Sequence, residues 1–285
     1  MKNIIVPIDF SEDSLKGLDL ALLFSQKIYT NIQMVYVQKK SHYAYPGAIV
    51  KEEIREAEGR FEQIMESYLP KLGHDSRLRF IVRKGKVYEE VVSQADSYKD
   101  AIICCSTHGA SGFEELFIGS NAFRIISATE RPVFTLTKGD APKDFKTIIL
   151  PIDVTPQTRQ KLPLTTTIAQ MFKAEVHVVS VSASRSKQAQ SRLRAYSKQV
   201  SDYLKGAGVP IVTDSVVGDN ITDLTLNYAN AVQADLISIM TEQETSLSNL
   251  LLGSYAHQML NNSHIPVLSI TPSEMRVSGS FRTFG

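Results

Sequence analysis

The chain has 285 residues, a formal net charge of +1 and a hydrophobic fraction of 43%. This length leaves room for two domain cores, and the balanced charge argues against a nucleic-acid-binding surface. The longest apolar runs have the length of β-strands, so we expect no membrane span. Met1 leads directly into a strand-like segment without a signal peptide, and we therefore expect a cytoplasmic protein.

Strand-like and helix-like segments alternate through the first 138 residues. The short apolar runs predict five strands, at residues 4–9, 32–37, 78–82, 101–105 and 133–137. Helices are expected between them: a first one capped by Ser11 or Asp13, with apolar positions from Leu15 to Phe24, and three more at residues 50–68, 87–98 and 121–129. The strands are too apolar on both faces for a half-exposed sheet, so the pattern predicts an α/β fold with a parallel sheet covered by helices on both sides.

The chain repeats this pattern once. Residues 4–11 return as 148–155, residues 116–120 return as 250–254, and residues 131–133 return as 265–267. The offsets lie between about 133 and 144 residues, which indicates the duplication of a whole domain. We expect a first domain at 1–138, a linker at 139–145, a second domain at 146–272 and a loose tail at 273–285.

Two local features accompany the repeat. Pro163 stands early in the first helix of the second copy, where it predicts a kink or a delayed helix start. Cys104 and Cys105 are adjacent on a predicted strand, so their side chains point to opposite faces, and we expect two small buried hydrophobic side chains rather than a disulfide.

A glycine-bearing stretch follows the fourth strand of the first copy. It runs from Ser106 to Gly119-Ser120 and opens a helix near Asn121. Loop amides and the free N–H groups of a helix start form a natural anion site, and glycines let a phosphate come close. The alternative is a simple turn, with Ser120 as the helix cap.

Asp9 is the second candidate. It ends the first predicted strand at the carboxyl edge of the sheet, where open α/β sheets bind ligands. Its alternative role is to cap the following helix.

Four short motifs resemble those of the universal stress protein family in its tandem, two-domain form. They are Pro7-Ile8-Asp9, Thr107-His108-Gly109, Gly119-Ser120 and Arg131-Pro132-Val133, and the resemblance covers residues 1–273. It implies two tandem five-stranded parallel-sheet sandwiches of the Rossmann-type, adenine-nucleotide α-hydrolase-like kind.

The resemblance also implies a nucleotide site. ATP-binding relatives carry a glycine, two residues, a second glycine, nine residues and then Gly-Ser, and only the first glycine is replaced here, by Ser106. In similar proteins the aspartate meets the adenosine and the residue at Val37 lies against adenine. The implied nucleotide-binding residues are Pro7, Asp9, Val37, Ser106, His108, Gly109, Gly119, Ser120 and Asn121.

The second copy departs from this pattern. Residues 240–246 contain no glycine and include Glu242 and Glu244, which would repel a polyphosphate. Only Asp153, Val181 and Gly253-Ser254 are retained. We therefore expect a degenerate second site.

Two functions of different classes remain open. In the first, an adenine nucleotide (ATP, with AMP and ADP as alternatives and Mg²⁺ as an open companion) binds the first domain of a stress-response regulator. No catalytic or metal-ligating residue is assigned, and any hydrolysis is expected to be slow. In the second, the chain is a nucleotide-free interaction protein built as an internal pseudo-dimer. In either, residues 133–136 and 267–270 are expected to pair within the chain, and a further homodimer stays open.

Overall fold

The computed structural model describes residues 1–39, 47–107, 120–241, 243–246 and 249–272. The first repeat contains β1 (Asn3–Pro7), α1 (Glu12–Ser25), β2 (Asn31–Lys39), α2 (Gly47–Tyr68), the 3₁₀ turn η1 (Leu69–Lys71), β3 (Arg77–Gly85), α3 (Val87–Asp96), β4 (Ala101–Ser106), α4 (Ser120–Ala128) and β5 (Val133–Leu136). The predicted order of strands and helices is confirmed, and the boundaries differ from the prediction by a few residues at most.

The second repeat contains β6 (Thr147–Ile152), the 3₁₀ turn η2 (Pro156–Arg159), α5 (Leu162–Phe172), β7 (Glu175–Ser182), α6 (Lys187–Gly206), β8 (Ile211–Val217), α7 (Ile221–Ala231), β9 (Leu236–Met240), β10 (Gln243–Ser246), β11 (Asn249–Leu252), α8 (Ser254–Asn262) and β12 (Val267–Ile270). The delayed helix start is confirmed, because α5 begins only at Leu162 with Pro163 in its first turn.

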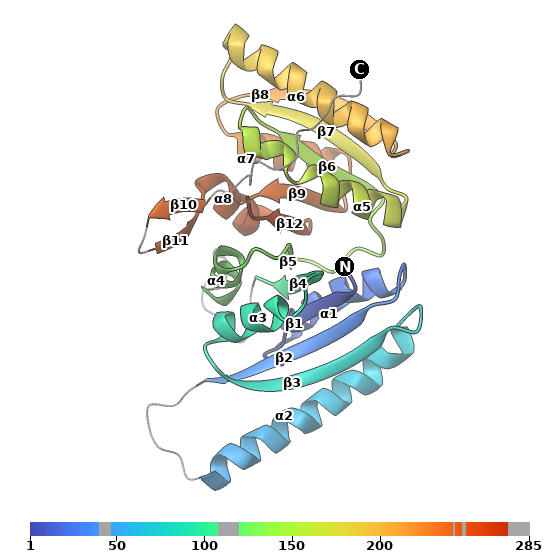
Figure 1. Cartoon of the computed structure of the whole chain (residues 1–285), viewed down its shortest axis with the longest axis vertical. Coiled ribbons are helices and arrows are strands. Elements are labelled where there is room, and N and C mark those ends of the chain that lie inside the picture. Colours follow the sequence, from blue (N-terminus) through green and yellow to red (C-terminus); the bar gives the residue numbers. More distant parts are fainter. Residues whose placement is uncertain (40–46, 108–119, 242, 247–248, 273–285) are drawn as a thin grey trace.

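The segment after β9 contains an additional pair of strands that the repeat pattern does not predict. β10 and β11 form an antiparallel hairpin, with Gln243 opposite Leu252. In Figure 1 this hairpin extends beside α8, and β11 also contacts α4 of the first repeat. The polar residues of β10 carry none of the apolar alternation by which a strand is recognised in sequence.

One ten-stranded sheet runs through the whole molecule, in the order β3-β2-β1-β4-β5-β12-β9-β6-β7-β8 (Figure 1). The five strands of each repeat are parallel to one another. The repeats join through an antiparallel pair of β5 and β12, with Phe134 opposite Leu268. The expected pairing of the two last strands is therefore confirmed.

Helices cover both faces of this sheet. One apolar core lies beneath α1, α2, α5 and α6, and the other beneath α3, α4, α7 and α8. Both cores include strand residues of both repeats. Along β4, Cys104 belongs to the first core and Cys105 to the second, and both thiols are free and buried, as the alternation of a strand predicts.

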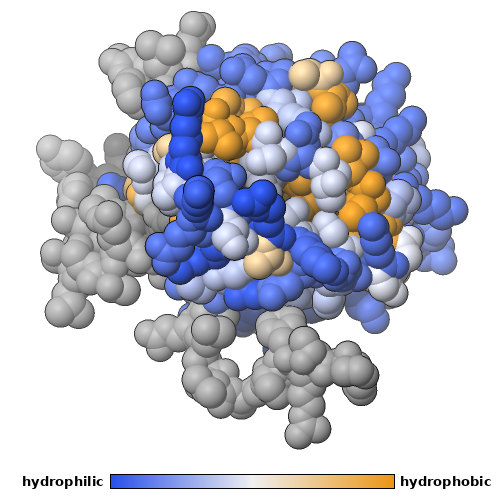
Figure 2. Space-filling model, turned by 90° about the horizontal axis from the view of Figure 1, so that it is seen from above, coloured by the Kyte–Doolittle hydropathy of each residue, from blue (hydrophilic) through white to orange (hydrophobic). Residues whose placement is uncertain are grey.

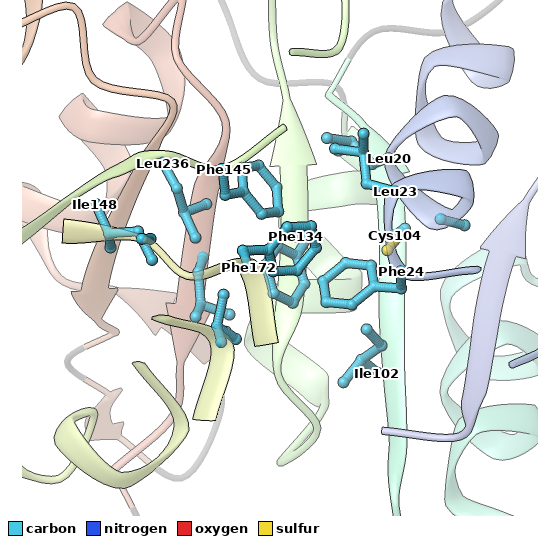
Figure 3. Close-up of a cluster of buried hydrophobic side chains, with 14 of the residues drawn as sticks. Leu20, Leu23, Phe24, Ile102, Cys104, Phe134, Phe145, Ile148, Phe172 and Leu236 are labelled. Atoms are coloured by element: carbon cyan, nitrogen blue, oxygen red, sulfur yellow. The ribbon is translucent and has the colours of Figure 1, made fainter. Parts of the chain in front are cut away.

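Four phenylalanine rings fill the core where the repeats meet (Figure 3). Phe24 comes from α1, Phe134 from β5, Phe172 from α5, and Phe145 precedes β6. The Phe145 ring lies 4.8 Å from that of Phe172, and the Phe24 ring lies 5.0 Å from that of Phe134. Phe145 is fully buried, so the end of the expected linker is part of the shared core.

The two ends of the sheet are edge strands with polar or charged side chains. At one end, β3 carries four exposed cationic side chains, those of Arg77, Arg79, Arg83 and Lys84. At the other end β8 is mostly exposed and carries Asp214 between Val212 and Val217. Seen from this end, the surface is largely hydrophilic, with separate hydrophobic clusters (Figure 2). Charged edge strands of this kind resist edge-to-edge association.

Helix α1 comes unusually close to β4. A Cβ added at Gly17 would lie 2.9 Å from the carbonyl oxygen of Cys104 and 2.9 Å from the Cα of Cys105. Glycine is therefore required here by contact with the backbone of the neighbouring strand. Gly59 in α2 offers the opposite case, since nothing lies within 4 Å of an added Cβ.

These two glycines give a matched prediction. Gly17→Ala should destabilise the chain by about 1–3 kcal/mol through overpacking, whereas Gly59→Ala should stabilise it by up to about 1 kcal/mol through helix propensity. Urea unfolding of both variants measures this. Equal effects of the two substitutions would contradict the close approach of α1 to β4.

The phenylalanine cluster gives a second prediction. Phe145→Ala should lower the free energy of unfolding by about 3–5 kcal/mol, because it leaves a cavity in the core that the repeats share. Leu69→Ala is the control, since Leu69 is 45% exposed, and a change within about 1 kcal/mol is expected. A Phe145→Ala variant as stable as Leu69→Ala in urea unfolding would show that the repeats fold without this contact.

Candidate functional site

The first repeat has one topological switch point, between β1 and β4. From these adjacent strands the chain continues to opposite faces of the sheet, to α1 after β1 and toward α4 after β4. Asp9 follows β1, and Ser106 ends β4. Because Ile5 pairs with Ile103 in a parallel register, both residues reach the same carboxyl edge, where open α/β sheets bind ligands.

Asp9 shapes the start of α1. Its Oδ1 accepts hydrogen bonds from the backbone N–H of Ser11 at 3.0 Å and from the Ser11 hydroxyl at 2.6 Å. Ser11 in turn caps α1, since its Oγ accepts from the N–H of Ser14 at 3.1 Å. The role of Asp9 in helix capping is therefore indirect. Ser11 caps α1, and Asp9 orients Ser11 through the two hydrogen bonds.

Phe10, between these two residues, has a left-handed backbone with φ of 66°. This conformation is an outlier for a bulky residue and persists only where surrounding contacts enforce it. The Phe10 ring lies 4.9 Å from both Tyr36 and Phe61, and the guanidinium of Arg60 lies 4.4 Å from the ring centroid. An Arg60 nitrogen also donates to the Phe10 carbonyl at 3.3 Å. Sequence reasoning missed Phe10, because nothing in its residue type predicts positive φ.

The other predicted site residues fall into two groups. Pro7 ends β1 opposite Val35, so Val37 on β2 lies level with Asp9 at the same edge and is buried. Ser106 is also buried, and Asn121 is exposed in the first turn of α4. His108, Gly109 and Gly119 lie outside the described residues, and of Ser120 only its position as the first residue of α4 is described.

The second repeat has its switch point between β6 and β9. The Asp153 Oδ1 accepts from the N–H of Thr155 at 2.7 Å and from its hydroxyl at 2.5 Å, which reproduces the Asp9–Ser11 arrangement. Val154 is not among the positive-φ residues of the described chain, however. The two hydrogen bonds therefore form without a left-handed residue, and the strain at Phe10 belongs to the first repeat alone.

A buried lysine lies beside Asp153. Lys161 is only 3% exposed, and its Nζ donates to the Thr158 hydroxyl at 3.4 Å, the one hydrogen bond that the ammonium makes to the described residues. Burial lowers the pKa of Lys161 from its ordinary value to about 8, while the negative charge of Asp153 acts in the opposite direction. Sequence reasoning missed this residue, because lysines are almost always exposed.

Tyr255, in the first turn of α8, is the second unpredicted side chain near Asp153. Its hydroxyl lies 3.5 Å from the Thr225 hydroxyl. Burial raises the pKa of Tyr255, the hydrogen bond with Thr225 opposes this shift, and the charge of Asp153 adds to it. Asp153 therefore interacts electrostatically with both Lys161 and Tyr255.

The described residues contain no group of three or more His, Cys, Asp or Glu side chains that could hold a metal ion. Nor does any of their helices have both the length and the apolar character needed to cross a bilayer.

Each repeat contributes a Rossmann-like half of the sheet, with an aspartate after its first strand at the switch point. This arrangement is typical of α/β proteins whose ligand crevice lies at the carboxyl edge. The comparison with protein families is more specific. The model of the universal stress protein family matches residues 1–136 and 144–270. The chain belongs to the universal stress protein family, in a tandem arrangement of two family units.

Similar proteins support the same assignment. A universal stress protein of Methanocaldococcus jannaschii is 26% identical over 144 residues, covering 44% of this chain and 82% of that protein. The crystal structure of a universal stress protein from Archaeoglobus fulgidus has a TM-score of 0.77 at 16% identity, covering 95% of this chain and 99% of that chain. A structure described as a putative universal stress protein from Pseudomonas aeruginosa has a TM-score of 0.61 at 14% identity, covering 95% and 94%. At these identities the two structures show the shared fold.

The buried lysine gives a pH-dependent prediction. The pKa of Lys161 is about 8 in the folded chain and 10.5 in its ordinary state, so between these values the unfolded chain binds more protons and stability rises with pH. Lys161→Met should be more stable than the natural chain at pH 7, and the difference should shrink by about 3 kcal/mol by pH 10.5.

Lys198→Met is the control for this experiment, because Lys198 is exposed and its ion pair among the described residues is with Asp202. Its effect should stay within about 0.5 kcal/mol at either pH. Urea unfolding at several pH values measures both variants. A Lys161→Met curve that runs parallel to the natural chain from pH 7 to 10.5 would contradict the burial of a charged amine.

Proposed function

We propose that the first repeat binds an adenine nucleotide at the carboxyl edge of β1 and β4, and that the chain acts as a nucleotide-responsive regulator in a stress response. ATP is the leading ligand, with AMP and ADP as alternatives. The proposed contacts are the residues named from the sequence, with Asp9 as the acceptor for the nucleoside and Val37 as its apolar neighbour.

The observation that carries this proposal is the strained turn at Asp9. Backbone strain at a bulky residue costs on the order of 1–3 kcal/mol and clusters at binding and catalytic sites. The second repeat makes the same two aspartate hydrogen bonds without that strain. These two hydrogen bonds therefore do not require a left-handed residue, and a ligand that needs the Asp9 carboxylate in a fixed position would account for the strain at Phe10.

The surroundings of Asp9 support the same reading. Asp9 is exposed to solvent, whereas Asp153 is partly buried next to Lys161. Val37 supplies a buried apolar side chain on the neighbouring strand, which suits a flat base. Phosphates would be held by the stretch from Ser106 to Ser120, which lies mostly outside the described residues.

The repeat supplies its own control for a binding experiment. Asp9→Ala should weaken ATP, ADP or AMP binding at least about tenfold, the loss expected for a charge-assisted hydrogen bond. Asp153→Ala removes the matching carboxylate of the second repeat and should leave the affinity unchanged. Calorimetric titration of both variants, with Mg²⁺ and with a chelator, measures this and tests whether the ion takes part.

Two outcomes would overturn the proposal. One is equal weakening by both substitutions. The other is no binding of any adenine nucleotide to the natural chain below millimolar concentration, which would favour the nucleotide-free interaction protein as the function.

A further inference from the structure

The two repeats can be compared position by position at the start of their first helices. Asp9 and Asp153 are 144 residues apart, and the same offset aligns Ser11 with Thr155 and Gly17 with Lys161. The glycine that lets α1 touch β4 is thus replaced by a buried lysine in the second repeat. This replacement is the largest change of side-chain size between the two aspartate turns and their helices.

The backbone of the second repeat differs from that of the first at the lysine. α1 runs without a break from Glu12, but the equivalent stretch is divided into η2 and α5, and Lys161 stands at the break as the residue before α5. Thr165 fixes this position, because its hydroxyl donates to the Lys161 carbonyl at 2.9 Å and lies 2.9 Å from the Ser238 hydroxyl on β9. The lysine is therefore anchored above the strand that corresponds to β4.

A second position at the carboxyl edge also carries a larger side chain in the second repeat. Gly119-Ser120-Asn121 of the first repeat corresponds to Gly253-Ser254-Tyr255, so a tyrosine stands where the first repeat has an exposed asparagine. Lys161 arrives from the α5 side of the sheet and Tyr255 from the α8 side, and both lie within electrostatic reach of Asp153. The Lys161 ammonium and the Tyr255 hydroxyl therefore both lie near Asp153.

We infer that Lys161 and Tyr255 fill the crevice of the second repeat, so that it keeps the fold of a nucleotide site while its own side chains occupy the space of the ligand. The inference rests on the proposed function, because the filled crevice explains why a nucleotide binds in the first repeat and not in the second. Lys161 and Tyr255 are then the residues that decide which repeat binds.

The test opens the crevice and uses adenosine as the probe, because adenosine needs no phosphate loop. Lys161→Ala with Tyr255→Asn removes the filling side chains, and Lys161→Met with Tyr255→Phe keeps their volume. Both pairs are made together with Asp9→Ala, which weakens binding at the first repeat equally in both chains. Saturation-transfer NMR should detect an adenosine site with a Kd of about 1 mM or tighter on the opened chain that the filled chain lacks.

Equal adenosine binding to the opened and filled chains, or none to a folded opened chain, would overturn the inference. Neither result depends on whether the natural chain binds a nucleotide in its first repeat, so the inference and the proposed function fail separately.

A second measurement uses the natural chain and does not depend on the folding of a variant. Acetylation of the native protein with a succinimidyl ester, followed by mass spectrometry, should modify Lys161 at least about tenfold more slowly than the exposed Lys198, since reaction at Lys161 requires local opening. Equal rates at the two lysines would show that the crevice is open and would overturn the inference.

Discussion

The antiparallel pair of β5 and β12 is the interaction on which the rest of the structure depends. It removes the edge that each five-stranded sheet would expose, and it makes both apolar cores continuous from one repeat to the next. Phe145 closes the junction from the connecting segment. Each repeat contributes its own switch point to the shared sheet, between β1 and β4 in the first repeat and between β6 and β9 in the second.

The two aspartate turns show how the first and second repeats differ. Both bind the serine or threonine two residues later with the same pair of hydrogen bonds. In the first repeat the aspartate is exposed, and an aromatic cluster holds a left-handed residue beside it. In the second, a buried ammonium lies nearby, and its desolvation costs free energy unless the charge is paired. In the proposed function the first turn belongs to an open nucleotide site, and in the further inference the second belongs to a filled one.

Much of this fold is readable from the sequence because buried parallel strands are continuous apolar runs. The strands predicted at 101–105 and 133–137 end within one residue of β4 and β5, and the repeat of 4–11 at 148–155 indicated the tandem arrangement. The β10–β11 hairpin was missed because β10 is polar. The conformation of Phe10 and the burial of Lys161 were missed because tertiary contacts decide both. The predictions for His108, Gly109 and Gly119 stay predictions.

The central claim is that one chain offers one nucleotide site although it contains two family units. Native mass spectrometry of the intact natural chain in excess ATP or AMP counts bound ligands directly, without any substitution. We expect a single added nucleotide per chain at saturation. Two added nucleotides per chain, or an unliganded chain at every concentration tested, would contradict it.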